Sequence, residues 1–282
     1  MALPLYKRLI VLRLLPSVFF NQVLVEITSR HIAVITIAAG LKKTVIDRQF
    51  LAVNAPDDVF NQLTIALAQQ KKHKKQKNSL LKVVVASEFV RYLALPAHHI
   101  SMNNADKSAY ARAAYHEVYG NMVDDWQIQC DDAAPNQITI VAAMDQQLIT
   151  HLTVIAEKSG LELVSVQPQL MPVFNQLKHA LNLADVYFGV VESNRLLFAH
   201  LQNGHWQSLR SVVLESDWQS QLSSLAKREQ LLTETNDNKL LMIYAPTHES
   251  AKMHMIEGWT VKRIGLSAIN NTEKHYAMLE VA

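Results

Sequence analysis

The sequence predicts an α/β protein built from a duplicated unit, with two lobes that each contain a mixed β-sheet. Two stretches, at about 23–53 and 186–213, each hold three β-rich segments joined by very short turns, which is typical of an antiparallel meander. A helix and further strands follow each meander, so the order of elements at about 23–86 recurs at about 186–264. The length of 282 residues also fits roughly two domains of about 150 residues each.

The first repeat opens with a three-strand meander. Its expected strands are Val23–Thr28, His31–Ala38 and Lys43–Val53. A helix should follow, because Asp57 and Asp58 suit the positive end of a helix. The apolar positions expected to bury that helix are Val59, Leu63, Ile65 and Leu67. The helix ends in a basic run, Lys71–Lys77, and the strongly apolar segment Leu81–Ala86 follows as a strand.

The basic run Lys71–Lys77 has two interpretations. Cations favour a helix C-terminus, and the rest of the run then forms a solvated loop. In the alternative, the run binds anionic lipid or nucleic acid. The net charge of +2 is too balanced for a dedicated nucleic-acid binder, so we favour the first interpretation and expect no nucleic-acid partner.

The middle of the chain alternates strands and helices, which indicates the α/β half of a mixed sheet. A strand at Arg91–Pro96 precedes a helix at Asp106–Tyr119 that Gly120 ends. The expected buried positions of this helix are Ala109, Ala113, Tyr115 and Val118. The next elements are strands at Trp126–Cys130 and Ile138–Ala143, a helix at Gln146–Ser159, a strand at Leu161–Val166 and a helix at Pro172–Leu183.

The second repeat has the same opening as the first. Its expected strands are Val186–Val191, Arg195–Leu201 and Trp206–Val213. A helix at Trp218–Thr233, a strand at Leu240–Tyr244, a helical segment at 248–256 and a strand at Thr260–Ile264 follow. We place the boundary near Asn182–Asp185, which gives lobes at 1–184 and 185–282.

The chain contains the same order of elements twice: a meander, a helix, a strand, a helix and a strand. This order resembles the actin-like, ribonuclease-H-like fold. Four segments narrow this resemblance: KVVVASEFVRYLALP at Lys82–Pro96, YHEVYG at Tyr115–Gly120, and the stretches Thr139–Leu177 and Asp185–Gly204. They resemble the actin-like pilus assembly protein PilM, its agglutinin-pilus relatives, and the cytoplasmic domain of the type II secretion L protein. The resemblance covers about residues 22–215.

The resemblance implies a small inserted subdomain at about 87–137 and a non-enzymatic scaffold at the cytoplasmic face of the inner membrane. Such a platform binds the tail of a bitopic inner-membrane assembly protein and couples it to the assembly ATPase. A homo-oligomer is a further expectation. The alternative is an actin-fold ATP-binding protein or ATPase with divergent phosphate loops.

The resemblance also implies where a nucleotide would bind, because the actin-like fold holds ATP and its metal between two hairpin loops of the type Asp-x-Gly-x-x-x-Thr. In the first lobe Glu26 stands for the Asp, and Thr28 sits where the family has Gly. In the second lobe the Asp is missing, and the loop contracts to a tight turn at Glu192. The vestigial nucleotide-binding positions are Glu26, Thr28, Ser29, Gly189, Glu192 and Ser193.

The glycine content agrees with a lost nucleotide site. Phosphate-binding loops need glycines, which let backbone N–H groups approach the ligand. Seven glycines in 282 residues are about 2.5%, against an average near 7%, and no two lie within five residues of each other. We therefore expect neither ATP hydrolysis nor a cofactor.

Other catalytic or metal chemistry has no support in the sequence. His116 and His248 each precede a glutamate as in a zinc-protease helix, but neither has a second histidine one helical turn later. The single cysteine, Cys130, excludes an intrachain disulfide and a multi-cysteine zinc site. We expect no catalytic and no metal-binding residues.

A short patch at the rim of the insertion is the candidate partner-binding site. On the expected strand, alternation places Phe89 and Arg91 on one face and Tyr92 on the opposite face. Aromatic residues and arginine most often anchor interfaces, so we predict that these three residues contact the partner's tail in the cleft between the first lobe and the insertion. The alternative is a core strand with an incidental arginine.

The N-terminal segment has two interpretations as well. Arg13 and Pro16 interrupt its apolar run, which argues against a signal peptide and a transmembrane helix. The segment is either a structural element packed on the first lobe or an interfacial anchor with Lys7, Arg8 and Arg13 facing lipid phosphates.

Overall fold

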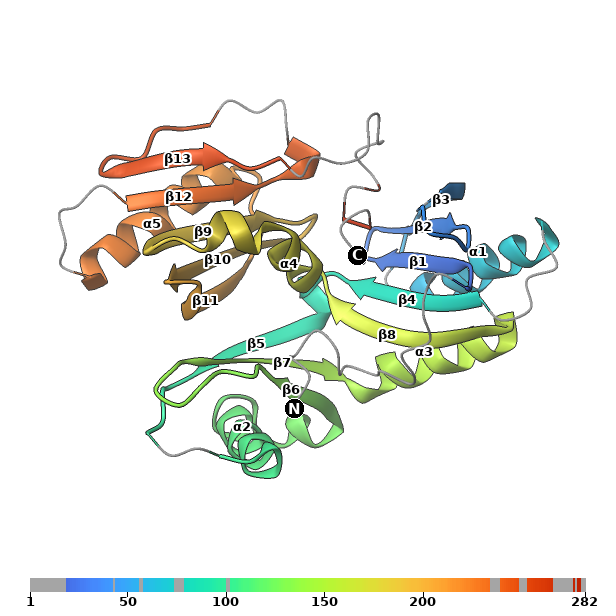
Figure 1. Ribbon diagram of the computed structural model, residues 1–282, viewed down its shortest axis with the longest axis horizontal. Coiled ribbons are helices and arrows are strands. Elements are labelled where there is room, and N and C mark those ends of the chain that lie inside the picture. The colour runs from blue at the N-terminus through green and yellow to red at the C-terminus, as the bar shows by residue number, and fades with distance from the viewer. Residues whose placement is uncertain are drawn as a thin grey trace.

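The structure is a computed structural model of the 282-residue chain. It describes residues 19–42, 44–55, 58–73, 79–99, 102–233, 239–248, 253–265, 276 and 278–279. The predictions for the N-terminal segment, for Asp57 and for Lys74–Lys77 lie outside these residues. Two lobes and a smaller third sheet are arranged around a common centre (Figure 1).

The sheet of the first lobe has five strands in the order β3-β2-β1-β4-β8. Their bounds are β1 Gln22–Ile27, β2 His31–Ile37, β3 Val45–Ala52, β4 Ser79–Val85 and β8 Leu161–Pro168. The first three strands are antiparallel, and β4 and β8 continue the sheet in parallel. This arrangement confirms the predicted meander and makes the sheet mixed.

The sheet of the second lobe repeats this topology in the order β11-β10-β9-β12-β13. Its strands are β9 Asp185–Val191, β10 Arg195–Gln202, β11 His205–Val213, β12 Lys239–Tyr244 and β13 Trp259–Arg263. Antiparallel pairing of β9, β10 and β11 and parallel pairing of β9, β12 and β13 match the first sheet strand for strand. The predicted duplication is confirmed.

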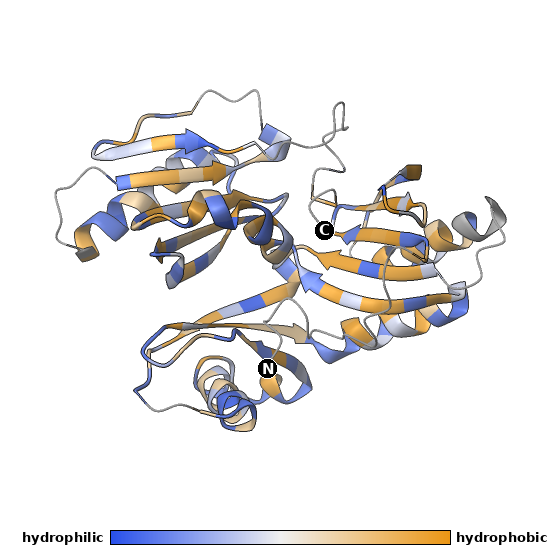
Figure 2. Ribbon diagram, viewed as in Figure 1, coloured by the Kyte–Doolittle hydropathy of each residue, from blue (hydrophilic) through white to orange (hydrophobic). Residues whose placement is uncertain are grey.

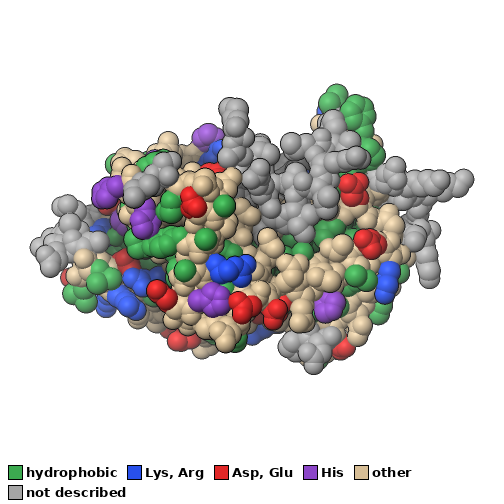
Figure 3. All heavy atoms as spheres, turned by 90° about the horizontal axis from the view of Figure 1, so that it is seen from below, with side chains coloured by type: hydrophobic (Ala, Val, Ile, Leu, Met, Phe, Trp, Pro, Cys, Tyr) green, Lys and Arg blue, Asp and Glu red, His purple; other side chains and the backbone are tan. Residues whose placement is uncertain are grey.

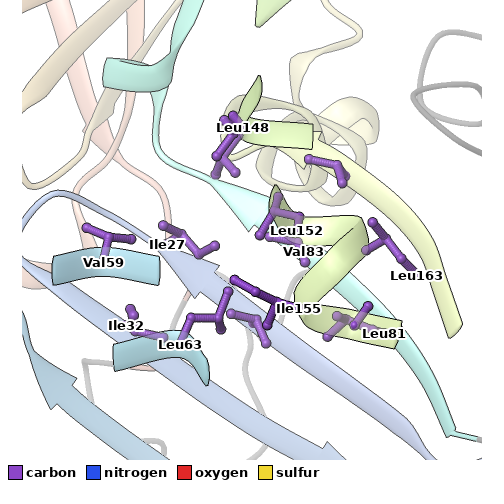
Figure 4. Close-up of a cluster of buried hydrophobic side chains, with 14 of the residues drawn as sticks. Ile27, Ile32, Val59, Leu63, Leu81, Val83, Leu148, Leu152, Ile155 and Leu163 are labelled. Carbon is purple, nitrogen blue, oxygen red and sulfur yellow. The ribbon is translucent and has the colours of Figure 1, made fainter. Parts of the chain in front are cut away.

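Helices α1 (Val59–His73) and α3 (Gln146–Ser159) pack on the same face of the first sheet. Figure 4 shows the apolar side chains from both helices and from the strands that meet there, with Leu63 and Leu152 near the middle. Two local signals fix the ends of α3: the Asp145 side chain accepts a hydrogen bond from the Gln147 N–H at 2.7 Å, and Gly160 adopts the left-handed conformation at the C-cap.

The helices of the second lobe cover opposite faces of its sheet. Helix α4 (Leu170–Leu181) shares a core cluster with Phe188, whereas α5 (Trp218–Thr233) shares one with Tyr187, the preceding residue of β9. Both faces of β9 are therefore buried, and its predominantly apolar ribbon in Figure 2 agrees with this position at the middle of the sheet.

The insertion is a three-stranded antiparallel sheet covered by a helix. Its elements are β5 Val90–Leu95, α2 Asn104–Tyr119, the 3-10 helix η4 Gly120–Asp125, β6 Trp126–Cys130 and β7 Thr139–Asp145, with the strand order β5-β7-β6. The sheet thus extends through β7 to Asp145, past residue 137. Tyr115 joins α2 to the sheet, because its hydroxyl donates to the carbonyls of Arg91 and Val141 at 2.7 and 3.1 Å.

Two predicted helix faces are wrong in part. On α2 the buried positions are Ala111 and Tyr115, whereas Ala109, Ala113 and Val118 are exposed. Residues two apart on a helix point about 200° away from each other, so the face that contains Ala111 turns Ala109 and Ala113 to solvent. On α1, Leu63 and Leu67 are buried, and Ile65 between them is 47% exposed for the same reason.

The predicted helix at 248–256 is also wrong for residues 253–256, although His248 is the last residue of the 3-10 helix η5 (Pro246–His248). Residues 253–256 have no regular secondary structure. The His254 N–H donates at 2.7 Å to the side chain of Gln219 on α5 rather than to a helical carbonyl. A turn from Ile256 to Trp259, closed at 3.0 Å, then leads into β13. No helix of the described residues is long and apolar enough to cross a membrane.

Candidate functional site

The two hairpins at the centre of the molecule have matching turns. In the first lobe the Thr28 N–H donates to the His31 carbonyl at 3.0 Å, and in the second lobe the Glu192 N–H donates to the Arg195 carbonyl at 2.9 Å. The structure therefore places Thr28 and Glu192 at equivalent positions of the duplicated unit. Both hairpins are the loops from which the resemblance predicted nucleotide contacts.

Polar groups of the first hairpin bond within the protein. The Thr28 hydroxyl accepts from the His31 N–H at 2.8 Å and from the Arg30 N–H at 3.1 Å, and it lies 3.0 Å from the His31 carbonyl, to which it donates. Glu26 is buried at the end of β1, where its Oε1 accepts from Gln169 Nε2 at 2.7 Å. The side chains of Thr28 and Glu26 are thus bonded to other groups of the protein.

Glu192 of the second hairpin is buried and contacts the first lobe. Its Oε2 accepts from the Ser87 N–H, and its Oε1 is bonded to Ser87 Oγ, both at 2.7 Å. Burial raises the pKa of Glu192 from its ordinary value of 4.5 to about 8; hydrogen bonds from Ser87 oppose this shift, and the negative charges of Glu26 and Glu88 add to it.

The two remaining vestigial positions of the second lobe do not form a phosphate loop. Gly189 lies inside β9, where an added Cβ would be 3.6 Å from the side chains of Ile243 and Leu222. These are ordinary van der Waals distances, so the position lies within the packed sheet and not in a loop. Ser193 lies in the tight turn between Glu192 and Asn194.

A third carboxylate, that of Glu88, lies between the two hairpins. Glu88 belongs to the short 3-10 turn η3 (Ser87–Phe89), which follows β4. Its Oε1 accepts from the Ser29 N–H at 2.6 Å, and its Oε2 accepts from Ser29 Oγ at 2.7 Å and from Asn194 Nδ2 at 2.8 Å. One side chain thus bonds donors from both lobes.

These residues do not fit a nucleotide with its metal. The hairpin donors that would meet phosphate oxygens are bonded to Glu88, and the carboxylates of Glu26 and Glu88 bring negative charge to the same centre. A phosphate is also negative and would be repelled there. Among the described residues, no group of three His, Cys, Asp or Glu side chains is arranged to hold a metal ion.

A cavity of about 360 Å³ lies beside this centre, at the junction of the first lobe and the insertion. Its wall is made of α1, α3, η3 and the three strands of the insertion, through Phe60, Glu88, Phe89, Arg91, Trp126, Ala143, Asp145, Gln147, Leu148 and His151. Figure 3 views the molecule from the side of the insertion and α3, where apolar side chains are interspersed with basic, acidic and histidine side chains. Cavities of this size with mixed walls are typical of ligand sites.

The structure brings two of the three predicted partner-binding residues to this cavity. Phe89 lies in η3, not on the predicted strand, yet it lines the cavity together with Arg91. Tyr92 does not line it: its hydroxyl lies 3.1 Å from Ser87 Oγ, and its ring packs against apolar clusters of both lobes. Burial raises the pKa of Tyr92 well above its ordinary value.

Arg91, which lines the cavity, keeps unused hydrogen-bonding capacity. Its Nη1 donates to the carbonyls of Glu88 at 3.0 Å and Val90 at 3.3 Å. Among the described residues, its Nε and Nη2 have no partner. These two donors form the pair with which an arginine binds a carboxylate or a backbone carbonyl.

Several residues of the site had no distinguishing signal in the sequence. Phe60 and His151 form one wall with ring centroids 4.8 Å apart, but they are on different helices. Trp126 contributes from β6. Glu88 is 59 residues from Ser29 and 106 residues from Asn194, so no local spacing relates the three.

The fold that these elements define is the actin-like fold, with two lobes of the same topology. One similar structure is the cytoplasmic domain of EpsL, an inner-membrane component of the type II secretion system of Vibrio cholerae, with a TM-score of 0.58 and 12% identity over 93% of this chain and 92% of that chain. Another is the PilM–PilN type IV pilus biogenesis complex, with a TM-score of 0.59 and 12% identity over 88% and 89% of the two chains.

A third similar structure is a Bacteroides thetaiotaomicron protein of unknown function with an actin-like ATPase fold, with a TM-score of 0.53 and 8% identity over 82% of this chain and 85% of that chain. No protein-family model matches the sequence, and no curated protein sequence matches it. The expected fold is therefore established by structure rather than by sequence similarity.

Proposed function

We propose that this chain is a non-enzymatic scaffold in the assembly of a type IV pilus or type II secretion system. It lies at the cytoplasmic face of the inner membrane and binds the cytoplasmic tail of a bitopic membrane protein. The similarity to the EpsL domain and to PilM in complex with PilN supports this proposal. An assembly ATPase and a second copy of the chain are the further partners that we propose.

The observation that carries the proposal is the cavity beside Arg91. A peptide segment fits it in three respects. A volume of about 360 Å³ accommodates a few side chains, the rings of Phe60, Phe89 and Trp126 offer apolar contact, and Arg91 Nε and Nη2 offer donors for a carboxylate or a main-chain carbonyl.

In this proposal the chain itself hydrolyses no ATP. The bonds from Ser29 and Asn194 to Glu88 support this, because a nucleotide would have to displace an internal carboxylate from both hairpins. Isothermal titration with Mg-ATP tests this part. We expect no binding, and submillimolar affinity would favour the alternative of an actin-fold ATPase.

Peptide binding tests the site. The probes are synthetic peptides that cover the cytoplasmic segments of bitopic membrane proteins encoded beside this gene, and fluorescence anisotropy measures their affinity. We expect one segment to bind the wild-type chain, and Arg91→Ala to bind it roughly five- to thirty-fold more weakly, which corresponds to about 1–2 kcal/mol for one interface anchor.

Lys158→Ala is the matched control, because Lys158 is an exposed cation on α3 that does not line the cavity. It should bind like the wild-type chain. Equal binding by Arg91→Ala, or binding by none of the peptides, would contradict the proposal. A melting curve accompanies each variant, and a large fall in melting temperature for Arg91→Ala would place Arg91 in the core instead.

A further inference from the structure

Three donors of different chemical type converge on the Glu88 carboxylate. They are the backbone N–H and the hydroxyl of Ser29, and the side-chain amide of Asn194, at 2.6, 2.7 and 2.8 Å. An ionised carboxylate accepts hydrogen bonds and donates none, and bonds to it are short. All three contacts have this direction and length.

The donors belong to equivalent turns of the two lobes. Ser29 lies in the β1–β2 turn and Asn194 in the β9–β10 turn, and each turn is closed by its own backbone hydrogen bond. The adjacent residue, Ser87, is bonded in turn to Glu192 of the second lobe. The turn Ser87–Phe89 is therefore held from both sides by groups whose positions the two sheets fix.

We propose that the two hairpin turns form an oxyanion site, and that this chain fills the site with its own Glu88 carboxylate, which joins the two lobes in place of an external anion. The site binds small oxyanions as a class. Its donors are neutral groups (a backbone amide, a hydroxyl and a side-chain amide), and they stabilise a negatively charged oxygen whichever group carries that oxygen. This inference does not depend on which partner the cavity binds.

The proposal predicts that an anion added from solution replaces a deleted Glu88 side chain. Glu88 is only half-buried, so a small anion reaches the site from solvent. Propionate is the probe, because it carries a carboxylate on a short aliphatic chain with as many carbons as the glutamate side chain. Thermal unfolding is measured in sodium propionate and in sodium chloride of equal ionic strength, so that general salt effects cancel.

We expect Glu88→Ala to melt several degrees below the wild-type chain in chloride. Propionate at about ten times its dissociation constant should raise the melting temperature of Glu88→Ala by about 3 °C relative to chloride. The wild-type chain should show no such rise. Glu157→Ala is the matched control, because it removes an exposed glutamate of α3, and it should also show none.

A second measurement exchanges the carboxylate of Glu88 and the amide of Asn194. These substitutions change the charge but leave both side chains close to their original size. Asn194→Asp places a second carboxylate against Glu88 and should lower the melting temperature. Glu88→Gln should lower it as well, because the glutamine NH₂ group then faces the donors of Ser29 and Asn194. The double variant Glu88→Gln/Asn194→Asp restores a donor and a carboxylate across the lobes, and it should recover much of the loss.

Two results would overturn the proposal. One is the same propionate response in Glu88→Ala, in the wild-type chain and in Glu157→Ala, which would be a general salt effect. The other is a double variant that melts at the temperature expected from adding the two single effects, which would mean that Glu88 and Asn194 do not interact. If Glu88→Ala does not fold in chloride, the fraction of the variant that refolds is measured in propionate and in chloride instead of the melting temperature.

Discussion

Replacing Glu192 with glutamine should change how the stability of the protein depends on pH. Glu192 is 2% exposed, and both of its carboxyl oxygens are bonded to Ser87. Burial is the main cause that raises its pKa from 4.5 to about 8, and the charges of Glu26 and Glu88 act in the same direction. The folded chain therefore keeps a proton that the unfolded chain releases.

The sign of the effect follows from this difference. Between about pH 4.5 and pH 8 the unfolded state binds fewer protons than the folded state, so the free energy of unfolding falls as the pH rises. The stabilisation is complete below about pH 4.5 and is lost by about pH 8. At about 1.4 kcal/mol per pH unit, the displacement from 4.5 to about 8 sets an upper limit of about 5 kcal/mol. Glutamine has no proton to release and stays neutral throughout.

Urea unfolding, followed by tryptophan fluorescence from about pH 5 to about pH 9, measures this difference. The comparison is made between Glu192→Gln and the wild-type chain at each pH, because the contributions of the twelve histidines then largely cancel. We expect the variant to gain stability relative to the wild-type chain as the pH rises, and to approach a plateau above about pH 8. A difference that stays constant across the range would refute the raised pKa.

Three further substitutions test the packing around the site. Tyr92→Phe removes a hydroxyl bonded to Ser87 Oγ at 3.1 Å, so calorimetry should show a loss of about 1 kcal/mol with unchanged peptide affinity, and weaker peptide binding would place Tyr92 in the site instead. Leu152→Ala opens a cavity at a fully buried position and should cost about 2–5 kcal/mol in urea unfolding, whereas a loss below about 1 kcal/mol would contradict the described core. Gly160→Ala forces a side chain into a φ of 70° at the end of α3 and should cost about 1 kcal/mol in a thermal melt; no loss would mean that this helix ends differently.

The duplicated fold could be predicted from the sequence because its signals are local. Each meander consists of neighbouring strands with very short turns, and the predicted strand Val23–Thr28 corresponds to β1 at Gln22–Ile27. The predicted helix Gln146–Ser159 has the same bounds as α3, because Gly160 marks its C-terminal end in the sequence. The buried face of α2 could not be predicted in the same way, because the alanines of this helix fit more than one apolar stripe. Only packing against the sheet selects Ala111.

The candidate site could be predicted only in part. Alternation along β5 places Arg91 and Tyr92 on opposite sides as predicted, whereas Phe89 precedes the strand and reaches the cavity from η3. The opposite wall of the cavity comes from α1 and α3, and their packing is a tertiary property. The role of Glu88 depends on donors far away in the sequence, which no local pattern identifies.

Site-specific photocrosslinking in cells tests the central claim, that the cavity between the first lobe and the insertion binds a membrane protein's cytoplasmic segment. A photoreactive residue replaces Gln147, which lines the cavity, or Lys158, which lies outside it on the same helix. Our account predicts that the Gln147 position crosslinks to the cytoplasmic tail of one bitopic membrane protein, that Arg91→Ala weakens this crosslink, and that the Lys158 position lacks it. Equal crosslinking from both positions, or no membrane protein crosslinked from Gln147, would contradict the account.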